Sequence, residues 1–267
     1  MSEITVAVAQ FAPTPDRPAN RTRVVDLINK AAADNAQLII VPEYASFCAR
    51  ELGPDFAAHS ESLDGPFVTD ISRAAHERGV WVIAGLVESS DERDRFSNTL
   101  VAVSPNGDVA TTYRKQHLYD AFGARESEWV TPGPLLEPTL IDVGGFAVGM
   151  QTCYDLRFPE VSRTLVNAGA ELIAVPAQWI RGPLKEAHWS TLIAARAIEN
   201  TVFVAASDQG APLGIGQSRI VDPTGVTLAG VGSTDGTALA TLNHDTLVRV
   251  RTENPVLTAR RYRVCPN

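Results

Sequence analysis

The feature that most constrains the fold is a repetition, because two parts of the chain follow the same order of elements. Each part predicts strand, helix, strand, helix, strand and hairpin. The apolar run at residues 38–42 (LIIVP) has a counterpart at residues 172–176 (LIAVP), in the same place in that order. Any α/β protein reuses Val, Ile and Ala, but the shared order of the elements favours a duplicated half.

Local patterns give approximate bounds for these elements. In the first half we expect strands at 4–10, 38–42 and 80–85, helices at 21–35 (capped by Asn20) and 65–78, and a hairpin turn at 104–107. In the second half we expect strands at 146–152, 172–176 and 202–206, helices starting at Pro159 and spanning 184–200, and a hairpin around 221–226. Two such sheets pack face to face with their helices outside. The chain therefore predicts an α/β fold, a four-layer αββα sandwich with two similar halves.

Composition limits the possible partners. With 267 residues and no linker, we expect a single domain over residues 1–267. The net charge of −8 argues against nucleic acid or an anionic membrane. No apolar run reaches the roughly 18 residues of a membrane-spanning helix, and residues 1–6 do not resemble a signal peptide. Three cysteines without paired spacing (Cys48, Cys153 and Cys265) fit a reducing, cytoplasmic location.

Cys153 lies where the strand at 146–152 is expected to turn into the helix that starts at Pro159. A sharp strand-to-helix turn lifts a side chain out of the sheet edge and surrounds it with free backbone N–H groups, as a nucleophile requires. The alternative is an inert buried cysteine that acts as a small apolar residue. The polar run at 154–157 favours the reactive cysteine, because an inert one has no use for such neighbours.

Two further charged residues stand at comparable places. Glu43 follows the strand at 38–42, and Lys115 follows the first hairpin. Carboxyl ends of strands gather in one crevice of an open α/β sheet, so these residues and Cys153 are expected to meet. Taken singly, each charge is more often a solvated surface group. Together they would supply a nucleophile, a base and a cation for an oxyanion.

Three ordered motifs around these residues resemble the nitrilase superfamily, hydrolases of non-peptide carbon–nitrogen bonds. They are residues 41–44 (VPEY), 113–118 (YRKQHL) and 153–160 (CYDLRFPE). The resemblance covers nearly the whole chain and implies an αββα sandwich that forms a homodimer. It also implies that Cys153 is the nucleophile, Glu43 the general base and Lys115 the catalytic lysine. A second glutamate of the family matches Glu126, although Glu128 competes for that place.

The expected chemistry is thioester formation without a cofactor or metal. A helix N-terminus and Lys115 would favour the Cys153 thiolate, and Glu43 can accept the thiol proton. Attack on an amide carbonyl creates an oxyanion, which would face the Lys115 ammonium and the backbone N–H of Tyr154. Ammonia then leaves, and water activated by Glu43 hydrolyses the thioester.

The substrate class is less constrained than the reaction. The short chain and the motif at 153–160 look most like the small-amidase branch, of the ω-amidase and deaminated glutathione amidase types. Hydrolysis of N-carbamoyl amino acids is the first alternative, and nitrile hydrolysis is the second. Arg157 matches an arginine beside the substrate carboxylate in carbamoyl hydrolases, or else it pairs with Asp155 or Glu160. Trp179 is a further candidate for substrate contact, followed by Arg181 and Lys185.

Two hypotheses from other classes remain at this stage. One is a papain-like thiol hydrolase that pairs Cys153 with His117 or His188, although no Cys-Gly-x-Cys-Trp signature surrounds Cys153. The other is a non-catalytic binding module that kept the fold. Thiol labelling distinguishes the second, because the cysteine of an inactive pocket should label slowly.

Overall fold

The computed structural model describes residues 2–265, whose strands form two six-stranded sheets with the same topology. The first sheet has the order β12-β1-β2-β3-β4-β5 and the second the order β6-β7-β8-β9-β10-β11. In each, three parallel strands are followed by an antiparallel hairpin, and a further antiparallel strand closes the opposite edge. The predicted repetition of the two halves is therefore confirmed at the level of sheet topology.

The strands have the following bounds. The first sheet contains β1 (Glu3–Gln10), β2 (Leu38–Ile40), β3 (Trp81–Ser89), β4 (Phe96–Val103), β5 (Val109–Arg114) and β12 (Gly236–Asn243). The second contains β6 (Ile141–Val143), β7 (Phe146–Met150), β8 (Leu172–Ala177), β9 (Phe203–Asp208), β10 (Arg219–Val221) and β11 (Thr227–Gly230). The edge strands β6 and β12 were not predicted, because they lack the unbroken apolar run of the central parallel strands.

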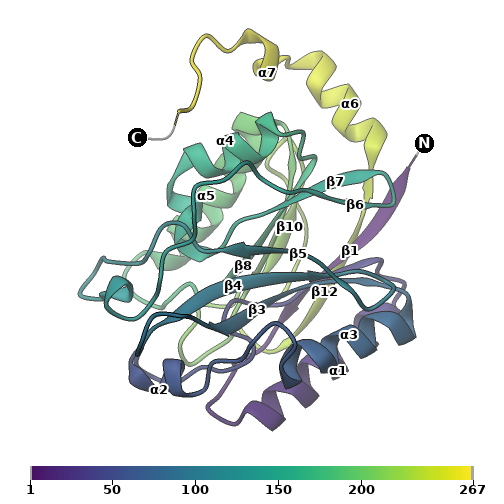
Figure 1. Ribbon diagram of the computed structural model, residues 1–267. Coiled ribbons are helices and arrows are strands. Elements are labelled where there is room, and N and C mark those ends of the chain that lie inside the picture. Colours follow the sequence, from purple (N-terminus) through teal and green to yellow (C-terminus); the bar gives the residue numbers. More distant parts are fainter. Residues whose placement is uncertain (1, 266–267) are drawn as a thin grey trace.

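Helices cover the outer face of each sheet, which confirms the four-layer αββα sandwich (Figure 1). Helices α1 (Arg17–Ala33) and α3 (Pro66–Arg78) pack on the first sheet, while α4 (Pro159–Asn167) and α5 (Lys185–Asn200) pack on the second. A separate apolar cluster fills the space between the two sheets. The central strands are apolar on both faces, as expected for parallel strands covered on both sides.

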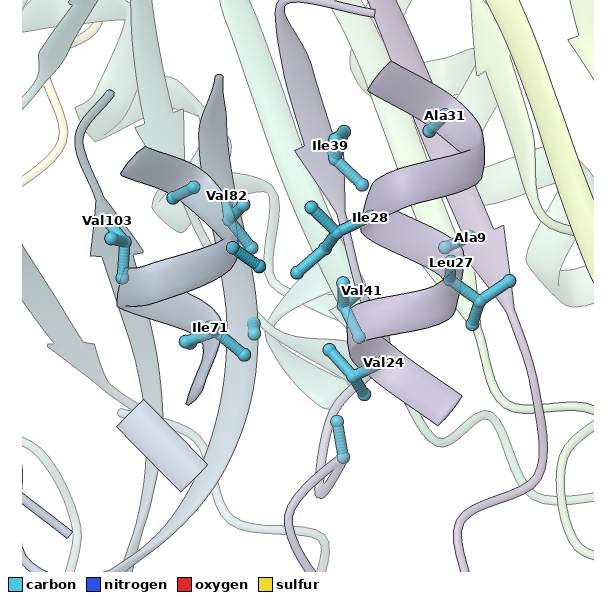
Figure 2. Close-up of a cluster of buried hydrophobic side chains, with 14 of the residues drawn as sticks. Ala9, Val24, Leu27, Ile28, Ala31, Ile39, Val41, Ile71, Val82 and Val103 are labelled. Atoms are coloured by element: carbon cyan, nitrogen blue, oxygen red, sulfur yellow. The ribbon is translucent and has the colours of Figure 1, made fainter. Parts of the chain in front are cut away.

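Figure 2 shows the apolar layer under the first pair of helices. Val24, Leu27 and Ile28 of α1 face the sheet, where Ile39 and Val41 meet them. Leu38 and Ile40 point to the opposite side and join the cluster between the sheets. Alternate residues of one short strand thus bind two layers together, which fixes the position of the loop that follows β2.

The start of α1 differs from the prediction. The helix begins at Arg17, and the side chain of Asp16 caps it by accepting a hydrogen bond from Ala19 N at 3.0 Å. Asn20, the expected cap, is instead buried inside the first turn, where its Nδ2 donates to the carbonyls of Thr14 and Ser46. A proline at the second helical position supports the earlier start.

The basic segment after β12 forms α6 (His244–Glu253) and α7 (Val256–Ala259), which lie beyond α4 and α5 (Figure 1). Arg251 donates to the carbonyl of Thr201, and Arg260 donates to Asn167 Oδ1 at 2.6 Å. The tail is thereby attached to the ends of the second pair of helices. Across the described residues, every helix is too short or too polar to cross a membrane.

Candidate active site

Four of the residues singled out in the sequence line one cavity of about 120 Å³. Glu43 follows β2, Lys115 follows β5, Glu126 lies in a 3₁₀ turn at Glu126–Glu128, and Cys153 begins a second 3₁₀ turn at Cys153–Arg157. The first three come from the first half and the connection after it, and the cysteine comes from the second half. The cavity is therefore assembled where the two halves meet.

The backbone at Cys153 is strained. Its φ is +45°, a left-handed conformation that residues other than glycine rarely adopt. Thr152 before it is extended, and its N–H donates to the Asp155 carboxylate at 3.1 Å. The Sγ atom points to the carbonyl of Gln178, 3.4 Å away. The strand turns sharply at the cysteine, as predicted, but the thiol lies at the start of the short 3₁₀ turn, and the longer helix α4 begins only at Pro159.

Lys115 is held between two carboxylates. Its Nζ lies 2.9 Å from Glu43 Oε1 and 2.9 Å from Glu126 Oε2. Burial alone would lower the pKa of this lysine, but the charges of Glu126 and Glu43 outweigh it and raise the pKa well above its usual value. The two ion pairs therefore favour the charged form of Lys115 and hold its ammonium in place before any ligand enters.

Neutral donors hold the same two carboxylates from other sides. Asn98 Nδ2 donates to Glu43 Oε1 at 2.6 Å and to Glu126 Oε1 at 3.2 Å. The Tyr44 hydroxyl donates to Glu126, and the backbone N–H of Gln178 donates to Glu43 Oε2. Sequence reasoning missed the parts played by Asn98 and Gln178. The available signal was an asparagine in the middle of β4, a strand buried along its whole length.

The environment of Cys153 corrects one expectation. Burial, and next the negative charge of Glu43, raise the pKa of the thiol well above its usual value, although Lys115 acts in the opposite direction. The predicted stabilisation of a resting thiolate is therefore wrong. The physical reason is that the two neighbouring carboxylates and the loss of solvent outweigh one ammonium. In the free protein the thiol keeps its proton, beside a carboxylate.

The position of Glu126 separates it from its competitor. Glu126 is 3% exposed and lines the cavity with Lys115. The side chain of Glu128 is 53% exposed and pairs with Arg125 on the surface. Of the two glutamates that the sequence left open, Glu126 is the one in the cavity.

Asp155 joins the Cys153 turn to the segment that carries Lys115. Its fully buried carboxylate accepts hydrogen bonds from the Tyr113 hydroxyl at 2.7 Å and from His117 N and Nδ1 at 3.1 and 2.9 Å. The ring of His117 stacks on Phe158 at 3.8 Å between centroids. His117 is therefore engaged away from the cysteine. In the part of the chain that the structure describes, no histidine lines the cavity.

Tyr154, Arg157 and Trp179, the expected substrate contacts, also line the cavity. The Arg157 guanidinium lies over the Trp179 ring at 4.8 Å, and its Nη2 is 3.3 Å from His188 Nδ1. Neither Asp155 nor Glu160 forms an ion pair with it, so the structural alternative for Arg157 does not apply. Lys185 lines the same wall, whereas Arg181 does not.

Metal ligands are not grouped in residues 2–265, where no cluster of three or more His, Cys, Asp or Glu side chains is arranged to hold an ion. Glu43, Lys115 and Glu126 are instead bound to one another. The arrangement contains a nucleophilic atom, a carboxylate that can accept its proton, and a fixed ammonium. These are the parts that acyl transfer through a covalent intermediate requires.

Comparisons with known proteins find similarity to hydrolases of carbon–nitrogen bonds. A family model described as carbon-nitrogen hydrolase matches residues 5–252. The chain is 38% identical to the deaminated glutathione amidase of Escherichia coli O157:H7, over 96% of this chain and 97% of that protein. Two solved structures resemble it with 25% identity. A Saccharomyces cerevisiae member of branch 10 of the nitrilase superfamily has a TM-score of 0.86 over 98% of this chain and 97% of that one. An amidase double mutant from Nesterenkonia sp. AN1, in complex with acrylamide, has a TM-score of 0.80 over 95% and 96%.

Proposed function

The chain belongs to the carbon–nitrogen hydrolase family, and we propose that it is an amidase with a Glu43–Lys115–Cys153 triad. Its substrate is a small linear amide that carries a carboxylate, and its products are a carboxylic acid and ammonia. The observation that carries the proposal is the cavity in which Lys115 lies between Glu43 and Glu126, next to the Cys153 thiol. Residues 1–267 act as one hydrolase domain.

The first half-reaction forms a thioester. Glu43 takes the proton of the Cys153 thiol while Sγ attacks the carbonyl carbon of the amide. The carbonyl oxygen becomes an oxyanion beside the Lys115 ammonium and the Tyr154 N–H, and one such donor typically stabilises the transition state by about 3 kcal/mol. Protonated Glu43 gives its proton to the leaving nitrogen. The C–N bond breaks, ammonia leaves, and the acyl group stays on sulfur.

The second half-reaction returns the enzyme to its resting state. Glu43 accepts a proton from water, and the hydroxyl adds to the thioester carbon. The C–S bond breaks, the carboxylic acid leaves, and Glu43 returns the proton to Cys153 Sγ. The raised pKa of the thiol supports this sequence, because a protonated thiol needs a neighbouring base for attack and recovers its proton readily afterwards. Glu126 acts by positioning Lys115.

Amide substrates are preferred to the alternatives because of the relatives. The Escherichia coli and Bos taurus relatives, 38% and 35% identical, are both named deaminated glutathione amidase. N-carbamoyl amino acids, followed by nitriles, are the second and third substrate classes. Arg157 and Trp179 form the wall of the cavity where the non-reacting part of the amide is expected.

A release assay tests the proposal. Purified enzyme is offered ω-monoamides of short dicarboxylic acids, deaminated glutathione, N-carbamoyl amino acids and aliphatic nitriles, and the released ammonia or amine is measured. We expect amide turnover that a thiol alkylating agent abolishes and exhaustive chelation leaves intact. Turnover of none of these compounds would contradict the proposal. Loss on chelation, with recovery on addition of zinc, would point to metal-assisted hydrolysis instead.

The proposed enzyme is a cytoplasmic homodimer that binds neither nucleic acid nor membranes. Its three free cysteines and its net charge of −8 support this assignment. Exposed apolar side chains near the end of α5 and in the β10–β11 hairpin support a subunit contact, with Ile198 46% exposed and Val226 57% exposed. Sedimentation equilibrium of the purified protein tests the dimer, and a monomer at micromolar concentration would contradict it.

A further inference from the structure

Two cations of the second half face the cavity without an acidic partner. Arg157 and Lys185 both line it, and within residues 2–265 neither forms an ion pair. The carboxylates of Glu43 and Glu126 line the cavity too, but Lys115 and neutral donors bind them. The positive charges of Arg157 and Lys185 are therefore not neutralised by a carboxylate of the protein.

Arg157 has unused hydrogen-bonding capacity. Its guanidinium lies 4.8 Å from the centre of the Trp179 ring and 5.8 Å from that of Phe122. Its Nε is buried and has no hydrogen-bond partner. A buried guanidinium donor is normally satisfied, and one left open beside a cavity indicates a ligand that accepts a hydrogen bond there.

Lys185 lies over the same two aromatic rings. Its Nζ is 4.1 Å from the centre of the Phe122 ring and 5.8 Å from that of Trp179. The residue is only 5% exposed, and its ammonium donates to the Tyr119 hydroxyl at 2.8 Å. A lysine ammonium has three donors, and this contact uses one. The backbone is fixed as well, because Trp179 Nε1 donates to the Lys185 carbonyl at 3.0 Å.

Two like charges gathered on shared aromatic rings repel each other unless an anion separates them. Burial, followed by the charge of Arg157, lowers the pKa of Lys185, which is the expected sign of such repulsion. A carboxylate has two oxygens and fits between a planar guanidinium and a point-like ammonium. A neutral amide at the same place would leave both cations uncompensated.

We propose that Lys185 is a specificity residue that binds the carboxylate of the amide substrate jointly with Arg157, over the rings of Phe122 and Trp179. This inference rests on the proposed amidase function and narrows it. What it adds is the residue that selects for the carboxylate of a short monoamide, so that the corresponding diamide binds poorly. The charge requirement lies in the second half of the chain, apart from the groups that transfer protons.

The test compares monoamides of dicarboxylic acids of three to six carbons with the diamides of the same lengths. Each pair has the same shape and differs by one charge. In the Lys185→Met variant we expect the KM for the best monoamide to rise about tenfold or more, because a charge-assisted hydrogen bond is lost. Its kcat should change little, and the KM for the diamide should stay within about twofold. Lys185→Arg should retain the preference for the monoamide.

Arg181→Met is the matched control, since Arg181 is an exposed cation close to Lys185 that does not line the cavity. It should change neither KM. Equal losses on monoamide and diamide in Lys185→Met, or an unchanged preference, would overturn the proposal and make Lys185 a structural residue.

A binding measurement separates this inference from the amidase function. Calorimetry with the Cys153→Ala variant measures the affinity of free dicarboxylates, such as glutarate, without any turnover. We expect binding that Lys185→Met weakens in this background. If dicarboxylates bind in this way but no amide is hydrolysed, the amidase function fails and the subsite stands. If amides are hydrolysed but no dicarboxylate of the series binds, the subsite fails and the amidase stands.

Discussion

The two halves of the molecule share one sheet topology, yet the charges that they bring to the cavity differ in kind. In the first half and the connection after it, Glu43, Lys115 and Glu126 are bound to one another and to buried neutral donors. In the second half, Arg157 and Lys185 have no acidic partner in the described chain. Apart from Arg50, an exposed residue of the first half that also lines the cavity, the duplicated scaffold thus carries one satisfied and one unsatisfied set of charges.

This difference has a physical meaning. Charged groups that are already bonded need no reorganisation when charge develops on a substrate, so they suit proton transfer and oxyanion stabilisation. Cations that lack a counter-ion are stabilised only when a ligand supplies one, so they suit recognition. The division predicts that substitutions in the first set lower kcat, whereas those in the second set raise KM.

The loops after equivalent strands also take different parts. Glu43 follows β2 in the first half, and Gln178 directly follows β8 in the second. The two loops meet, because the N–H of Gln178 donates to Glu43 Oε2 at 2.6 Å. One copy of the loop supplies the carboxylate and the other orients it. The symmetry of the sheets therefore brings together residues that are not themselves equivalent.

The largest effect is expected at the nucleophile, the one reacting group that the second half supplies. Cys153→Ala should lower kcat by about 10⁴-fold or more, since no other group can form the thioester. Loss of one sulfur atom at a sheet edge should leave the melting temperature within a few degrees. Cys265→Ala, at an exposed position, is the matched control and should be silent. Substantial amide hydrolysis by Cys153→Ala would show that the division of labour is wrong.

The next largest effect is expected at Glu43. Glu43→Gln should lower kcat about 10²-fold or more, because both half-reactions lose their base. The charge of Glu43 raises the pKa of the Cys153 thiol, so its removal should lower that pKa and increase the thiolate fraction at a given pH. Alkylation of Cys153 by iodoacetamide at neutral pH should therefore become faster while turnover falls.

Faster alkylation of Cys153 together with slower turnover is expected only if Glu43 is a base beside a protonated thiol. Lys115→Met gives the reverse control, since the ammonium lowers the thiol pKa and its loss should slow alkylation. A near-normal kcat in Glu43→Gln, or slower alkylation, would mean that the base has been misassigned.

A smaller effect is expected at Glu126. Its substitution tests whether Glu43, Lys115 and Glu126 act together. Glu126→Gln should lower kcat about tenfold, because Lys115 loses the charge of one of its two carboxylate partners while a hydrogen bond remains. KM for a carboxylate-bearing amide should change little. Glu128→Gln is the matched control at a side chain that is 53% exposed, and it should leave both constants unchanged. Equal effects of the two substitutions would show that Glu126 does not act together with Glu43 and Lys115.

Sequence patterns predicted the scaffold and the cavity residues for identifiable reasons. Parallel strands covered on both sides need unbroken apolar runs, and the runs at 38–42 and 172–176 mark them in both halves. A charged residue directly after such a strand lies at the carboxyl end of the sheet, where the crevice forms. Glu43 could therefore be predicted to line the crevice. The edge strands β6 and β12 lack this signal, and they were missed.

What the sequence could not supply was the balance of interactions around each group. The pKa of the Cys153 thiol depends on its burial and on Glu43, which is far away in sequence, whereas the prediction considered only Lys115 and a helix N-terminus. Asn98 had no visible role until two carboxylates from different loops were seen to share its amide. The choice between Glu126 and Glu128 likewise needed the direction of a single 3₁₀ turn. Such features depend on three-dimensional neighbours rather than on local pattern.

The smallest effect is expected at His117, which tests a papain-like division of labour against the one proposed. In a papain-like enzyme the histidine accepts the thiol proton, and its removal costs roughly 10³-fold or more in kcat. Here Nδ1 of His117 lies 2.9 Å from the Asp155 carboxylate, and the ring stacks on Phe158. We therefore expect His117→Gln to lower kcat less than about tenfold and to reduce the melting temperature by a few degrees, because the ring stack on Phe158 is lost. Because the glutamine amide can still donate to Asp155, a large loss of kcat at unchanged stability would have to come from proton transfer. That result would move the base from the first half's carboxylate to the histidine.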